Sequence, residues 1–168
     1  MLDIIKTARA LSLTGPLMTA SVALLLVSEA RAEISGPPTI IDGDSLVIAG
    51  QRLDLHGIDA PEIGVICTKP DGKAFDCGRV ARTALLDLTA GALVICQPVG
   101  PLEQDRPATA RCTAGGFSLS RNMVHTGWAV ADRHTAESLV AVEEAARAKQ
   151  RGFWRWTITP PPWLPADR

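Results

Sequence analysis

The sequence predicts an α+β fold in which a small β-barrel of five strands carries three α-helices. Two observations lead to this prediction. Short β-branched or alternating segments, separated by Asp-Gly and Ala-Gly turns, fill residues 39–58. Segments with the apolar spacing or composition of helices occur once after the third strand and twice near the end. Five short, twisted strands can close on themselves as an OB-like barrel.

The first 32 residues have the pattern of a secretory signal peptide and precede the predicted domain. Lys6 and Arg9 form a basic start, an apolar run ends in residues 17–27, and Ala30-Arg31-Ala32 is a small-x-small cleavage signal. A transmembrane anchor is the alternative, but the uninterrupted apolar stretch is shorter than the about 20 residues that a spanning helix needs. We therefore expect export to the periplasm or the extracellular space, with no stable membrane insertion after cleavage.

The chain after the leader suits one domain, expected over residues 33–157, followed by a proline-rich tail at residues 158–168. The leader holds three of the 17 basic and two of the 18 acidic residues, which leaves 14 against 16 and a formal net charge of −2. A slightly acidic chain lacks the basic field that a nonspecific nucleic-acid binder needs. We expect a monomer.

The four cysteines all follow the leader, as Cys67, Cys77, Cys96 and Cys112. An even number of cysteines in an exported chain indicates two disulfides. Three connectivities are possible. The spacings favour Cys67–Cys77, which closes a local loop, and Cys96–Cys112, which ties two neighbouring strands. A zinc site is the alternative, but the chain has no CxxC pair.

Three strands are expected first, at residues 39–41, 45–48 and 51–58. Residues 63–76 contain Gly, Pro and Asp, and predict a loop that the first disulfide would pin. The three strands form a meander, so their turns bring polar residues to adjacent strand ends.

A helix is expected at residues 78–90, where apolar residues share one face and a glycine follows. Strands at residues 92–99 and 108–113 flank a charged, proline-bearing loop. Ser118 can cap a short helix that ends at Thr126, before a glycine. The last helix is expected at about residues 135–151, where Ala, Glu and Arg favour helix.

Tryptophans gather near the C-terminus, as Trp154, Trp156 and Trp163. We favour a tail that packs back on the barrel over an exposed aromatic patch that binds a partner or a sugar. Trp128 is expected in the core.

Residues 41–62 read IDGDSLVIAGQRLDLHGIDAPE and place four aspartates and a glutamate among apolar strands. IDGDS and RLDLHGIDAPE resemble the DGDT and RLxGIDAPE signature of the thermonuclease (staphylococcal nuclease-like) family. The segments CGRVARTALLDL, DRPATARC, MVHTGWAVA and EEAARAKQRGFW resemble later parts of that family, in order, so that the resemblance spans residues 38–156. The resemblance implies an OB-fold phosphodiesterase that uses calcium and cleaves DNA or RNA.

The resemblance also assigns roles to residues of this segment. The second Asp of DGDT and the Asp of DAPE hold the metal in the family, which implies Asp44 and Asp59 here, with the Ala60 carbonyl as a third ligand. Calcium prefers several hard oxygen ligands, and two turn-borne aspartates can supply them. Glu62 matches the glutamate that activates or orients the attacking water. The alternative is that the aspartates only make Asx-type turn bonds; we favour the metal for Asp44 and the turn for Asp42.

The positive half of the family's site is missing. Guanidinium groups that stabilise charge on phosphoryl oxygens contribute about 10³-fold or more to such reactions. The first family arginine precedes the DAPE aspartate by five positions, where this chain has Asp54. Arg52 shares that strand face, and we expect it to pair with Asp54 at a rim. Of the family's DRYGR motif only Arg106 remains as a candidate, Arg111 is expected to be solvated, and the chain contains no tyrosine.

Two main hypotheses follow. The chain is either an exported, calcium-dependent nucleic-acid phosphodiesterase (endonuclease) with reduced activity on single-stranded DNA or RNA, or a non-catalytic OB-fold binding or envelope protein derived from a nuclease. In a third hypothesis, Asp54 adds a carboxylate to the metal site beside Asp44 and Asp59.

Overall fold

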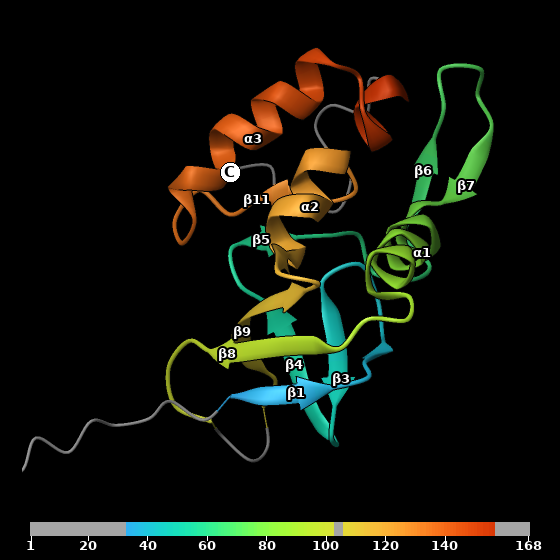
Figure 1. Cartoon of the computed structure of the whole chain (residues 1–168). Coiled ribbons are helices and arrows are strands. Elements are labelled where there is room, and N and C mark those ends of the chain that lie inside the picture. The colour runs from blue at the N-terminus through green and yellow to red at the C-terminus, as the bar shows by residue number, and fades with distance from the viewer. Residues whose placement is uncertain (1–32, 103–105, 157–168) are drawn as a thin grey trace, which may run out of the picture. The chain divides into compact units, whose positions relative to one another are not determined.

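The computed structural model describes residues 33–102 and 106–156, and Figure 1 shows their arrangement. These residues belong to one compact unit. The predicted signal peptide, the proline-rich tail and Trp163 lie outside the described residues.

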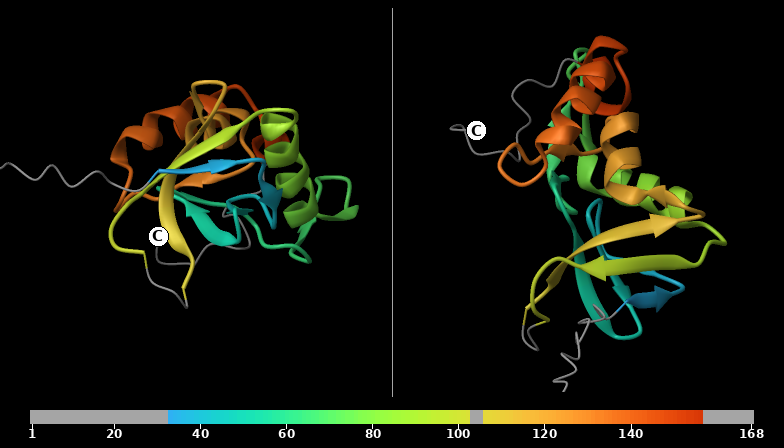
Figure 2. Two further views of the ribbon diagram at one scale, coloured as in Figure 1. Left: turned by 60° about the horizontal axis from the view of Figure 1, so that its bottom comes forward. Right: turned by 60° about the vertical axis from the view of Figure 1, so that its left-hand side comes forward.

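A curled sheet of seven strands forms the body of this unit (Figure 2). Its strands follow the order β1-β8-β9-β4-β3-β2, and β10 pairs with β9. All neighbours are antiparallel except β4 and β9, which are parallel, and β1 comes back into contact with β3. The result is a half-barrel, built from β1 (Ile34–Gly36), β2 (Thr39–Ile40), β3 (Ser45–Ile48), β4 (Gln51–Leu55), β8 (Val94–Pro98), β9 (Ala108–Ala114) and β10 (Phe117–Ser118).

The expected third strand is divided in two. Its first part is β4, and its last residues form β5 (Ile58–Asp59), which leaves the main sheet and pairs with β11 (Val130–Ala131). The chain therefore turns away from the barrel just before Asp59 and carries the following loop toward the helices.

The prediction of a loop at residues 63–76 is wrong in part, because this segment contains a hairpin of β6 (Ile66–Thr68) and β7 (Ala74–Asp76). Cys67 lies opposite Phe75 in this hairpin and forms a disulfide with Cys77, the first residue of the next helix. The sequence of this hairpin has too few apolar residues to show the alternation typical of strands. The disulfide ties the hairpin to the rest of the domain.

Three α-helices lie toward one end of the sheet (Figure 1), as the sequence predicted. The first, α1 (Cys77–Thr89), begins where the Asp76 carboxylate accepts a 2.8 Å hydrogen bond from the Arg79 N–H. The second, α2 (Leu119–Thr126), is capped by Ser118 as expected. The third, α3 (Glu137–Ala148), is shorter than expected, and a 3₁₀ helix, η1 (Gly152–Trp156), follows it.

The core lies between the concave sheet and the helices. Its completely buried members include Leu46 and Leu53 from the sheet and Leu85, Leu119 and Met123 from the helices. The two halves of the unit thus bury one continuous apolar cluster.

Both disulfides that the spacings favoured are present, and no described cysteine is free, so the zinc alternative is wrong. Cys96 and Cys112 lie directly opposite each other on β8 and β9.

The aromatic residues of η1 fold back onto the domain. Phe153 and Trp154 are buried, and the rings of Phe153 and Trp128 meet edge to face at 5.0 Å. This confirms the expected inward packing for Phe153 and Trp154, whereas Trp128, expected in the core, is partly buried against it. None of the helices in residues 33–102 and 106–156 is long and apolar enough to cross a membrane.

Candidate active site

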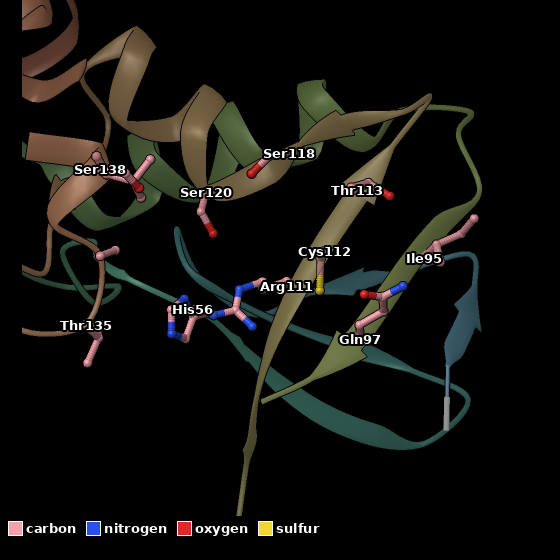
Figure 3. A pocket seen from close by; sticks show the side chains of 12 residues that line it. His56, Ile95, Gln97, Arg111, Cys112, Thr113, Ser118, Ser120, Thr135 and Ser138 are labelled. Atoms are coloured by element: carbon pink, nitrogen blue, oxygen red, sulfur yellow. The ribbon is translucent and has the colours of Figure 1, made fainter. Parts of the chain in front are cut away.

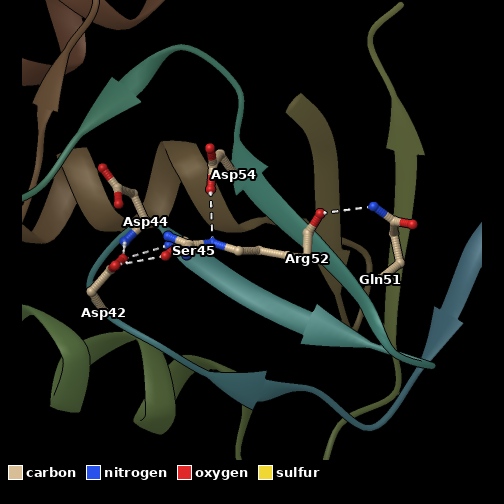
Figure 4. Close-up of polar contacts among 6 residues, drawn as sticks. All are labelled: Asp42, Asp44, Ser45, Gln51, Arg52 and Asp54. Atoms are coloured by element: carbon tan, nitrogen blue, oxygen red, sulfur yellow. Dashed lines mark hydrogen bonds and ion pairs between the residues drawn. The ribbon is translucent and has the colours of Figure 1, made fainter. Parts of the chain in front are cut away.

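Asp42 organises the turn between β2 and β3. Its Oδ1 accepts hydrogen bonds from the backbone N–H of Asp44 at 3.1 Å and of Ser45 at 2.7 Å, and its Oδ2 accepts one from the Ser45 hydroxyl at 2.6 Å (Figure 4). Both oxygens of this buried carboxylate are therefore used locally. The structure places Asp42 in the Asx-type turn that the sequence favoured for it.

Asp44 connects the two halves of the signature. Its Oδ2 accepts a 2.7 Å hydrogen bond from the Ala60 N–H, and its carbonyl accepts one of 2.7 Å from the Leu55 N–H. The turn after β2 and the loop after β5 are thus fixed side by side, although 16 residues separate Asp44 from Ala60.

Two glycines allow the segments to approach this closely. A Cβ on Gly43 would lie 2.6 Å from the Ala81 Cβ and 2.7 Å from the Ala60 Cβ. A Cβ on Gly78, in the first turn of α1, would overlap the backbone carbonyl of Glu62. The signature turn, the Glu62 loop and α1 therefore pack through positions where no other residue fits.

The carboxylates of this region repel one another. Burial, together with the neighbouring Asp42 and Asp59, raises the pKa of Asp44 to about 8. Burial and the nearby Asp42 also raise the pKa of Glu62. Burial acts to raise the pKa of Asp42 as well, but its hydrogen bonds to Ser45 and Asp44 outweigh this effect and lower it. The hydrogen bonds of the turn therefore favour the charged form of Asp42.

This donor set suits a hard divalent cation, because oxygen ligands with mutual repulsion gain most from a bound positive charge. Asp44 uses one oxygen for Ala60, while Asp42 has both oxygens engaged. Within the described part of the chain, no three Asp, Glu, His or Cys side chains converge as metal ligands. Any calcium held by Asp44 and Asp59 would therefore need the Ala60 carbonyl and water to complete its coordination.

Asp54 lies on β4, at the position that the sequence resemblance assigns to the family's first arginine. It lies opposite Ser45 in the β3–β4 register, next to the turn that carries Asp42 and Asp44. Arg52 Nε lies 4.0 Å from Asp54 Oδ1, and both side chains are about half exposed, at 50% and 46% (Figure 4). The expected pairing at the rim is present. Burial raises the pKa of Asp54, and Arg52 partly offsets this.

The remaining sequence candidates lie apart from this group. Arg106 is exposed in the loop before β9. Arg111 is an exposed residue of β9, as expected, but its guanidinium lies beside the His56 ring, at a cavity that the sequence did not indicate (Figure 3). The residues of that cavity come from separate strands and helices, so no local motif could have revealed it.

Comparisons with known proteins agree with the signature. The model of the family described as "Staphylococcal nuclease homologue" matches residues 52–156, which include Asp54, Asp59 and Glu62 but not the turn at Asp42 and Asp44. A protein named "Succinoglycan biosynthesis protein ExoI", from Rhizobium meliloti (strain 1021), is 32% identical over 138 residues, or 79% of this chain and 72% of that protein. An "Uncharacterized endonuclease" of Escherichia coli O157:H7 is 26% identical over 131 residues, or 74% of this chain and 79% of that protein.

The matched family has the OB-fold, is generally calcium-dependent and contains nucleases that bind nucleic acids. The curled half-barrel with three helices is the arrangement expected of such a domain. The family model covers well over half of this sequence. The chain therefore belongs to the staphylococcal nuclease homologue family.

Proposed function

We propose that the chain is an exported, monomeric, calcium-dependent phosphodiesterase that cleaves single-stranded DNA or RNA with reduced turnover. The hydrogen bond from Ala60 N–H to Asp44 carries this proposal, because it brings the metal-binding turn and the DAPE loop together. The family and the endonuclease name of one relative support the nuclease assignment.

Asp44 and Asp59 would hold the calcium ion, with the Ala60 carbonyl as a further ligand. The ion would supply positive charge for the phosphoryl oxygens. Glu62 is exposed at the start of the following loop and acts as the general base. Its carboxylate accepts a proton from the attacking water as the new oxygen–phosphorus bond forms and the bond to the leaving oxygen breaks. The raised pKa of Glu62 makes it a better proton acceptor near neutral pH.

Reduced turnover follows from the negative charge of Asp54 at the edge of the proposed site. The Asp54 carboxylate stands where a guanidinium would stabilise the transition state, and Arg52 is engaged with Asp54. Arg106 is the remaining candidate for the second cation and lies exposed in its loop. Loss of one such electrostatic donor typically lowers the rate by about 10²–10³-fold.

Export is supported by the leader pattern and by the two disulfides, since disulfides persist mainly outside the cytosol. The periplasm and the extracellular space both provide such conditions.

The test is the initial rate of cleavage of single-stranded DNA and RNA, with calcium and with a chelator. We expect slow, calcium-dependent cleavage that the Glu62→Gln variant loses. Equal rates for the wild type and Glu62→Gln over a wide range of calcium concentrations would contradict the proposal.

A non-catalytic binding or envelope role is the second candidate. The Arg52–Asp54 pair favours this role, because the Arg52 guanidinium is engaged with Asp54 and not with a phosphate group. In that case calcium binds to the protein but no cleavage is detected with any single-stranded substrate.

A further inference from the structure

A polar cavity lies outside the carboxylate group, between β8 and β9 and the beginnings of α2 and α3 (Figure 3). Its volume is about 460 Å³, within the usual range for small-molecule sites. The described residues that line it include no aspartate or glutamate. Its polar lining is formed mainly by His56, Gln97, Arg111, Ser120, Thr135 and Ser138.

Ser120 points into this cavity without a partner. Its side chain is directed toward Arg111 (Figure 3), and the residue is only 6% exposed. Within the described residues, the Ser120 hydroxyl makes no hydrogen bond, whereas the hydroxyls of Ser118 and Thr135 are engaged with Arg121 N–H and Asp132. Because this hydroxyl opens onto the cavity, it is available to donate a hydrogen bond to a bound acceptor.

Arg111 places a positive charge on the opposite wall. The guanidinium of Arg111 lies beside the imidazole of His56 (Figure 3). Burial and this guanidinium lower the pKa of His56, while the negative charge of Asp132 acts to raise it. Among the described residues, Arg111 forms no ion pair with a carboxylate, so its guanidinium can donate hydrogen bonds into the cavity.

The start of α3 adds further donors. Its N-cap residue, Ala136, lines the cavity and has no side chain that could accept from the first N–H groups of the helix. Ser138, in the same first turn, contributes a hydroxyl to the lining. A helix start of this kind favours an anion.

We propose that this cavity binds the phosphate group of a small molecule. Arg111 would bind two oxygens through its planar fork, and Ser120 and Ser138 would donate from the facing helices. Donors on opposite walls suit a group with three terminal oxygens better than a planar carboxylate with two. The site is separate from the proposed nuclease centre and does not depend on its activity.

Isothermal titration calorimetry of the purified protein, without calcium or nucleic acid, tests the proposal. Inorganic phosphate and a nucleoside monophosphate are the two phosphate sources, and acetate is the carboxylate control. We expect saturable binding of phosphate with one site per chain and weaker or undetected binding of acetate. Tighter binding of the nucleoside monophosphate would identify a phosphate monoester as the ligand; equal binding would identify the phosphate group alone. Both results support the proposal.

Two variants locate the site. Arg111→Gln should weaken phosphate binding by about tenfold or more, and Ser120→Ala by about tenfold, because each removes a hydrogen bond to a charged group. Arg79→Gln, an exposed arginine on α1 outside the cavity, should leave it unchanged. Because Arg111 is exposed, its variant keeps the fold even if Ser120→Ala does not.

No saturable phosphate binding below about 10 mM would overturn the proposal. Equal binding by the wild type and Arg111→Gln, or a preference for acetate, would overturn it as well. In the supporting case, the ring proton signals of His56 shift in NMR spectra as phosphate is added.

Discussion

Asp44 Oδ2 accepts a 2.7 Å hydrogen bond from the backbone N–H of Ala60, and this bond holds the two halves of the family signature together. Asp44→Ala should lower the free energy of unfolding by about 1–3 kcal/mol, because the Ala60 N–H loses its acceptor. Asp44→Asn keeps an acceptor and removes a carboxylate that Asp42 and Asp59 repel, so it should stay within about 1 kcal/mol of the wild type. Urea unfolding without calcium measures both, and equal losses in the two variants would contradict this account.

Calcium should stabilise the folded chain. A ligand at 100 times its Kd adds about 2.7 kcal/mol, which corresponds to a rise in Tm of about 5 °C or more. Asp44→Asn should lose most of this rise in differential scanning calorimetry. Asp54→Ala is the matched control, because Asp54 is half exposed and paired with Arg52. A clearly smaller calcium effect in Asp54→Ala would instead place Asp54 in the metal site.

Buried Glu143 should be important for stability. It is 1% exposed, accepts a 2.7 Å hydrogen bond from Ala131 N–H, and pairs with Arg147 at 2.6 Å and Arg133 at 3.6 Å. Glu143→Ala should cost about 1–3 kcal/mol, because it leaves the buried Ala131 N–H without its acceptor, while the half-exposed Arg133 and Arg147 regain water. The neighbouring exposed residue provides the control, since Glu144→Ala should change stability by less than about 0.5 kcal/mol. A similar loss in both variants, measured by urea unfolding, would contradict the prediction.

His56 should titrate below its ordinary pKa of 6.5, because burial and Arg111 disfavour its charged form. Since the folded pKa is lower than the unfolded one, the unfolded chain binds more protons in the window between them. The contribution of His56 to stability is therefore present above about pH 6.5 and is lost as pH falls through the folded pKa. NMR titration of the ring protons measures this. Arg111→Gln should raise the pKa of His56, and an unchanged value would show that Arg111 does not act on it.

The close approach of the signature residues could be predicted in part from the sequence. Spacing in the strand meander predicted the turn role of Asp42, and the alternation of side chains along β4 predicted the Arg52–Asp54 pair. The bond between Asp44 and Ala60 could not be predicted from local pattern, because it depends on how β5 leaves the main sheet to pair with β11.

Other features depend on contacts between distant segments. The β6–β7 hairpin has little apolar periodicity and is tied down by the Cys67–Cys77 disulfide. The cavity beside Arg111 joins three residues from separate segments: His56, which follows β4, Arg111 on β9 and Ser120 on α2. Such a set becomes visible only when the tertiary fold brings the segments together.

The central claim is that the carboxylate of Asp54 in the arginine position limits turnover. Its most direct test is the calcium-dependent rate of single-stranded DNA cleavage by the wild type, Asp54→Asn and Asp54→Arg. Asp54→Asn removes the anion without adding a cation, so it separates the two effects. We expect the cleavage rate to rise slightly in Asp54→Asn. It should rise by about tenfold or more in Asp54→Arg, because a guanidinium there stabilises the transition-state charge. A wild-type rate that is already typical of efficient enzymes, unchanged or lowered in Asp54→Arg, would contradict the claim.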